Sequence, residues 1–171
     1  MLSTIRASAF ILILVVFAGS APAVKTAFLA RKPTPSQDFS KRTGVVRVRA
    51  VSLNRSLFDQ AAATAFLQLR KAAPKAKLIV RMNFFNNRKI DVQWEKVEPV
   101  ENPAGVAWTG TVPGTRYGQA TLIYSLDAVT ANVTKGDGWL YQIHSAADRG
   151  LWAVEVDQSK FPRDHPPDDR R

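Results

Sequence analysis

The sequence predicts a mainly β domain with one early helix (α+β), folded as an antiparallel β-sandwich or as a strongly curved sheet of about seven or eight strands. Three observations lead to this fold class. Apolar and polar residues alternate in short segments that start roughly ten residues apart. Turn-forming residues separate these segments. A single segment changes from the strand period to the helical period of about 3.6 residues.

The first strand is expected directly after Gly44. Val46, Val48 and Ala50 alternate there with arginines at positions 47 and 49. This period of two predicts a half-buried strand.

The helix is expected over Leu57–Lys71, where apolar residues recur on one helical face. Ser56 is the expected N-cap, and Pro74 follows the helix where it cannot continue it. The apolar face is formed by Phe58, Ala62, Ala65, Phe66 and Leu69.

The clearest hairpin of the chain follows the helix. Its strands run through Leu78–Phe84 and Ile90–Glu95, on either side of a turn at Asn86-Asn87-Arg88. Glu98–Gly105, which carries two prolines, is expected to be a loop. The remaining strands form a meander, with expected positions Ala107–Val112, Ala120–Ser125, Val129–Val133, Trp139–Ile143 and Trp152–Val156.

The ends of the chain differ in character from this domain. Residues 1–23 have the order of a secretory signal peptide: Arg6, an apolar run of ten residues, then Ala21-Pro22-Ala23. Cleavage is expected between Ala23 and Val24, which predicts a secreted or periplasmic protein without a membrane span after signal removal. Residues 24–43 are expected to form a flexible basic arm, residues 44–160 the domain, and residues 161–171 a proline-rich charged tail.

Composition limits the chemistry that the chain can perform. At 46% apolar and 22% charged residues, the composition is that of a globular domain. The absence of cysteine excludes disulfides, thiol catalysis and zinc-thiolate sites. The net positive charge is concentrated in the N-terminal part of the chain, because residues 24–77 hold twelve Lys or Arg against two Asp. No aromatic stacking pattern accompanies these cations, so a nucleic-acid partner is not expected.

No motif for catalysis or for a cofactor is found in the sequence. His144 falls on a strand and His165 in the tail, so neither predicts a shared site. Asp91 and Glu95 share the polar face of one strand, which is expected to face solvent. Glu155 and Asp157 likewise point the same way along the last strand. We therefore expect no enzyme activity, no metal site and no cofactor.

The order of six stretches resembles the N-terminal propeptide-like domain of bacterial secreted zinc metallopeptidases of the reprolysin (metzincin) group. The resemblance covers residues 44–162. The stretches are VRVRAVSLN (Val46–Asn54), LIVRMNFFNN (Leu78–Asn87), AWTGTVPG (Ala107–Gly114), ATLIYSLDAVTANV (Ala120–Val133), GWLYQI (Gly138–Ile143) and AVEVDQSKFPRDHPP (Ala153–Pro167).

This resemblance implies a non-catalytic domain that assists the folding of a secreted zinc metallopeptidase or inhibits it. Because the chain carries no HExxH zinc motif, such a domain would act in trans or be a truncated remnant. Because it has no cysteine, it would not block the zinc with a thiolate. The alternative is an autonomous exported binding or envelope module that uses its basic N-terminal surface to bind an anionic partner.

Overall fold

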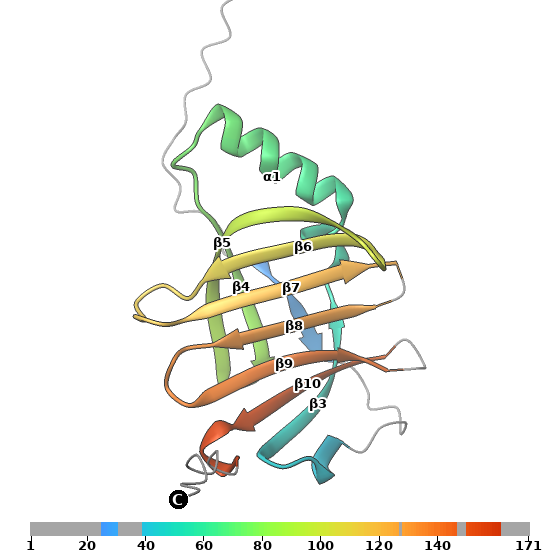
Figure 1. Ribbon diagram of the computed structural model, residues 1–171, viewed down its shortest axis with the longest axis vertical. Coiled ribbons are helices and arrows are strands. Elements are labelled where there is room, and N and C mark those ends of the chain that lie inside the picture. The colour runs from blue at the N-terminus through green and yellow to red at the C-terminus, as the bar shows by residue number, and fades with distance from the viewer. Residues whose placement is uncertain (1–24, 31–38, 127, 147–149, 162–171) are drawn as a thin grey trace, which may run out of the picture.

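The structure, a computed structural model, describes residues 25–30, 39–126, 128–146 and 150–161. Within these residues ten strands form one sheet, in the order β1-β4-β5-β6-β7-β8-β9-β10-β3-β2. The sheet curves into a nearly closed barrel (Figure 1). The strands are β1 (Lys25–Thr26), β2 (Phe28–Ala30), β3 (Val45–Leu53), β4 (Leu78–Phe85), β5 (Arg88–Glu101), β6 (Ala104–Thr111), β7 (Gln119–Ser125), β8 (Val129–Thr134), β9 (Trp139–Ser145) and β10 (Leu151–Asp157).

Residues 25–30 bring the two edges of the sheet together. β1 pairs with β4 in parallel, and β2 pairs with β3 in antiparallel fashion. Between them, the Ala27 amide donates to the carbonyl of Arg81, while the Ala27 carbonyl accepts from the amide of Asn54, both at 2.8 Å. Ala27 and Phe28 are fully buried, and the Phe28 ring packs on Phe84 with centroids 5.5 Å apart. The segment thus acts as a closing strand.

The fold class is confirmed in part. The chain is mainly β with one early helix, and the strongly curved sheet is correct, whereas the sandwich is wrong. Eight strands appear where the alternation places them. The other two, β1 and β2, come from residues 25–30, which the sequence assigned to the arm. Too few residues lie in each of them for an alternation to be visible, so their pairing depends on edges that only the folded sheet provides.

The helix α1 spans Gln60–Ala72 and covers one side of the barrel beside β5 and β6 (Figure 1). Its N-cap is Asp59, whose side chain accepts from the amide of Ala62 at 2.9 Å. Ser56, the expected cap, instead lies in the short 3-10 helix η2 (Arg55–Leu57). Phe58 then packs edge-on against Trp94 and Trp108, and its carbonyl accepts from the indole N–H of Trp108 at 3.0 Å.

The expected loop at Glu98–Gly105 is mostly strand. β5 continues to Glu101 and β6 begins at Ala104, so only a two-residue turn remains. Pro99 lies within β5, opposite Val106. β4 pairs with β5 only as far as Trp94, so beyond that point β5 has a neighbour on one side alone. Proline is tolerated in such an edge segment because its missing N–H costs no ladder hydrogen bond.

The two ends of the chain lie largely outside the described residues. This holds for the expected signal peptide, for the cleavage site at Ala23 and Val24, and for residues 162–171 of the expected tail. Two short 3-10 helices flank the barrel strands, η1 (Phe39–Lys41) and η3 (Gln158–Lys160). Among the described residues, no helix is long and apolar enough to cross a membrane.

Candidate functional site

The neighbouring strands β3 and β10 turn charged side chains toward the inside of the barrel. On β10, Val154 and Val156 form an outer cluster with Phe39, which lies in η1 and is 3% exposed. The opposite face of β10 carries Glu155, which is only 2% exposed. On β3, Arg47 lies directly opposite Glu155 in the strand pairing. The apolar alternation of both strands was predicted correctly. However, Val154 and Val156 of β10 and Val48 of β3 belong to the cluster around Phe39 on the outer face of the barrel.

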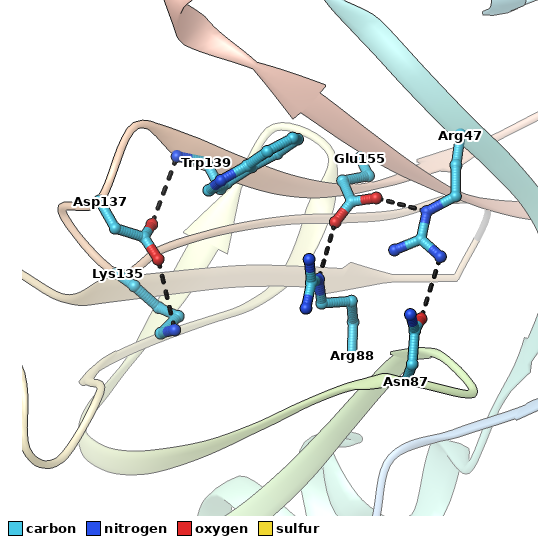
Figure 2. A network of polar contacts seen from close by, with 7 residues as sticks. All are labelled: Arg47, Asn87, Arg88, Lys135, Asp137, Trp139 and Glu155. Carbon is cyan, nitrogen blue, oxygen red and sulfur yellow. Dashed lines mark hydrogen bonds and ion pairs between the residues drawn. The ribbon is translucent and has the colours of Figure 1, made fainter.

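Glu155 is the centre of a hydrogen-bonded network (Figure 2). Its Oε2 accepts from Nε of Arg47 at 2.5 Å, and its Oε1 accepts from Nε of Arg88 at 3.2 Å. Tyr141, its strand partner on β9, lies beside the same carboxylate and interacts with it electrostatically. Arg47 also donates through Nη1 to the side-chain oxygen of Asn87 at 2.9 Å. Residues from β3, β5, β10 and the β4–β5 turn are therefore joined through one buried carboxylate, and Tyr141 of β9 lies beside it.

The network determines the protonation state of Glu155 in the folded protein. Burial by itself would raise the pKa of this carboxyl, but the hydrogen bonds from Arg47 and Arg88 hold its pKa below the ordinary value. Burial first, and the nearby Glu155 charge second, raise the pKa of Tyr141 from 10.0 to about 12. Glu155 is therefore a carboxylate and Tyr141 a neutral phenol across the neutral range of pH.

We expect Tyr141 to ionise late in an alkaline titration. Between pH 10 and about 12 the unfolded chain has lost this phenol proton and the folded chain has kept it. Stability therefore falls as the pH rises through that window. Phenolate absorbance of the folded protein should show a step near pH 12 that Tyr141→Phe removes. A wild-type titration without such a step would contradict the buried position of the hydroxyl.

A second arginine of β3 anchors the β4–β5 turn above this network. Arg49 donates to the side-chain oxygen of Asn86 at 3.0 Å and to the carbonyl of Asn83 at 2.9 Å. Its guanidinium and that of Arg47 both lie over the ring of Phe85. Burial lowers the pKa of Arg49, and its Nε has no hydrogen-bond partner among the described residues. The turn is therefore held by two arginines of β3, and of these Arg47 is paired with Glu155.

A pocket of about 430 Å³ opens beside the network, and we call it the mouth pocket. Its walls come from Asn87–Asp91, from the β6–β7 loop, and from the turn that leads into β9. These segments, with the start of β3 and the end of β10, lie at the same end of the barrel strands. Arg88 and Tyr141 contribute to both the network and the pocket wall. The buried network thus forms part of the pocket's supporting structure.

The charges that line the mouth pocket are Arg88, Lys89, Lys135, Asp91 and Asp137. The two carboxylates are already engaged. Asp91 accepts two hydrogen bonds from Arg81, at 2.7 and 2.9 Å, and Asp137 pairs with Lys135 at 3.3 Å (Figure 2). An apolar wall is provided by Ile90, Val112, Pro113 and Trp139.

Among the described residues, the structure does not bring together the other residues that the sequence singled out. His144 lies on the outer face, where its ring stacks on Phe39 at 5.4 Å, and burial, followed by the charge of Arg42, lowers its pKa. His165 lies outside the described residues. Asp91 and Glu95 have different partners: Asp91 pairs with Arg81, and Glu95 accepts a hydrogen bond from Thr111 at 2.8 Å. No group of three or more potential metal ligands occurs in the described ranges.

Glu155 is the site residue that the sequence did not predict. It was expected to point the same way as Asp157 along a polar strand face. Asp157 does lie at the surface, where it caps η3, but Glu155 is buried two residues earlier. The only local signal is its position among apolar neighbours in Ala153-Val154-Glu155-Val156. That signal would equally suit a strand with one solvent-exposed face.

Comparisons with known protein families, with curated proteins and with solved structures found no match to this chain.

Proposed function

We propose that this chain is an exported, non-catalytic binding domain that holds a small ligand in the mouth pocket. The observation that carries this proposal is the pocket of about 430 Å³ beside the buried Glu155 network. Small-molecule sites have volumes of about 300–1,000 Å³ and are often found in the mouths of β-barrels. This function develops the binding module that the sequence offered as its alternative, with the site moved from the basic N-terminal surface to the barrel mouth.

Two features of the pocket support binding in preference to catalysis. Its wall is fixed by strands and by the Arg47–Glu155–Arg88 network, which suits a preformed site. The titratable groups nearest to it are already engaged: Glu155 accepts hydrogen bonds from Arg47 and Arg88, and Tyr141 keeps its proton to about pH 12. Neither is poised to exchange protons near neutral pH.

A small-molecule screen with a blocked pocket tests this proposal. Thr115 lines the pocket, so Thr115→Trp should fill its entrance. Thr64→Trp makes the same change at an exposed position of α1 and serves as the matched control. Compounds that raise the melting temperature of wild type should still stabilise Thr64→Trp and should fail with Thr115→Trp. Hits that stabilise all three proteins equally would place the ligand elsewhere and overturn the proposal.

The propeptide-like role is a second proposal, and the order of the six stretches supports it. These stretches correspond to β3, β4, β6, β7 with β8, β9 and β10 of the barrel. The test is the refolding of a secreted zinc metallopeptidase that lacks its own propeptide, with and without this chain. An increased yield of folded protease, or inhibition of the mature protease, is the expected result. No effect on yield or activity at any ratio would contradict this role.

A further inference from the structure

We propose that the ligand of the mouth pocket is an organic anion with a flat apolar body, bound through Arg88 and Lys89. This inference rests on the proposed binding function and adds the chemical class of the ligand. Three features of the pocket point to this class of ligand: its charge balance, the unused donors of Arg88 and its apolar wall.

The charge balance favours an anionic ligand. Five cations, Arg47, Arg81, Arg88, Lys89 and Lys135, lie in or directly behind the pocket wall, against the three carboxylates of Asp91, Asp137 and Glu155. Each carboxylate has a cationic partner within 3.3 Å. The excess positive charge is therefore left on the side of Arg88 and Lys89. A cationic ligand would meet no uncompensated acid there.

Arg88 has donors left over for a ligand. Its Nε is used by Glu155 at 3.2 Å, and no hydrogen bond is found from its two Nη atoms to the described residues. The side chain is 45% exposed and lines the pocket. Since Glu155 holds the Nε edge, the guanidinium plane is fixed, and its terminal nitrogens are available to a carboxylate or phosphate group. In Figure 2 the Arg88 guanidinium lies between Glu155 and the Lys135–Asp137 pair.

The apolar wall suits a flat body joined to that anionic group. Trp139 is half-buried at the start of β9 and lines the pocket. Val112 and Pro113 of the β6–β7 loop and Ile90 of β5 complete the wall. An aromatic ring placed against an indole gains burial together with stacking. Inorganic phosphate would satisfy the cations but would leave this wall uncovered.

Calorimetric titration with three probes tests the inference. The probes are benzoate, its neutral counterpart benzamide, and inorganic phosphate. Benzoate should bind at least about tenfold more tightly than either of the others, because one well-formed charge-assisted contact is worth about that factor. Binding of benzoate should also quench Trp139 fluorescence, and Trp139→Phe should remove that part of the signal.

Two pocket variants and one matched control locate the anion. Lys89→Gln removes a pocket cation and should weaken benzoate binding several-fold, by about three- to tenfold. Lys75→Gln makes the same change in net charge at an exposed position before β4, far from the pocket wall, and should leave binding unchanged. Arg88→Lys keeps a charge beside Glu155 but removes the planar fork, so the advantage of benzoate over benzamide should shrink.

The outcomes separate this inference from the proposed function. Equal binding of benzoate and benzamide in the pocket, sensitive to Thr115→Trp, would overturn the anionic class while leaving the binding function intact. Equal weakening by Lys89→Gln and Lys75→Gln would reduce the effect to net charge and would also overturn it. A protein that binds none of the probes and gives no hit in the screen would contradict both proposals.

Discussion

Phe28→Ala is expected to destabilise the protein by about 3–5 kcal/mol, the usual cost of truncating a fully buried phenylalanine. Phe28 is the one large side chain of the closing strand that is fully buried, and its ring lies against Phe84. Its loss would leave a cavity where residues 25–30 join the two edges of the sheet. Urea denaturation, followed by circular dichroism, measures the change in the free energy of unfolding.

The neighbouring residue supplies a control on the same strand. Leu29 is 58% exposed, so Leu29→Ala should change the free energy of unfolding by only about 0.5 kcal/mol. Both variants truncate an apolar side chain of β2, and they differ in the direction of that side chain. Similar, small effects of the two substitutions would show that residues 25–30 do not close the barrel.

Arg47→Met is expected to cost about 2–3 kcal/mol, because it takes a charged hydrogen-bond donor from a buried carboxylate. Methionine keeps an apolar stem over Phe85, so most of the loss should come from the buried Glu155 carboxylate, which then keeps only its 3.2 Å contact with Arg88. The depressed pKa of Glu155 adds stability above the pKa of the unfolded carboxyl, and this contribution is lost as the pH falls through the folded value. The cost of Arg47→Met should therefore shrink in acid.

A second arginine pair in the same barrel is the matched control. Arg81 contacts Asp91 at 2.7 Å, but both side chains are about two-fifths exposed. Arg81→Met should cost about 0–1 kcal/mol, the usual range for a surface ion pair. The double variant Arg47→Met with Glu155→Met should recover part of the loss, because it also removes the buried carboxylate that has lost its closer partner. Equal costs for Arg47→Met and Arg81→Met would contradict a buried role for Glu155.

Much of the fold could be predicted from local patterns. Eight strands, the hairpin at Asn86-Asn87 and the single helix were all visible as periodicity between turn residues. The turn before β9 has Gly136 and Gly138 at positive φ. These features are local, since each depends on residues close together in the chain. Closure of the sheet depends on the pairing of residues 25–30 with β3 and β4. No local sequence pattern predicts this pairing.

The candidate site could not be predicted for a related reason. Alternation shows that two strand faces differ, but not which of them faces the barrel interior. On β10 the outer face is itself covered, because Phe39 packs on Val154 and Val156. The face that carries Glu155 could therefore turn inward, where Arg47 and Arg88 reach it from strands far away in the sequence. The network exists only through these long-range pairings.

Backbone amide NMR of the wild-type protein, titrated with benzoate, locates the ligand on the barrel directly. We expect the amides that shift to be those of residues 87–91, 112–115 and 135–141, which surround the mouth pocket. Shifts centred on α1 or on the exposed lysines that follow it would contradict the mouth pocket as the site. They would instead support binding at the basic N-terminal surface.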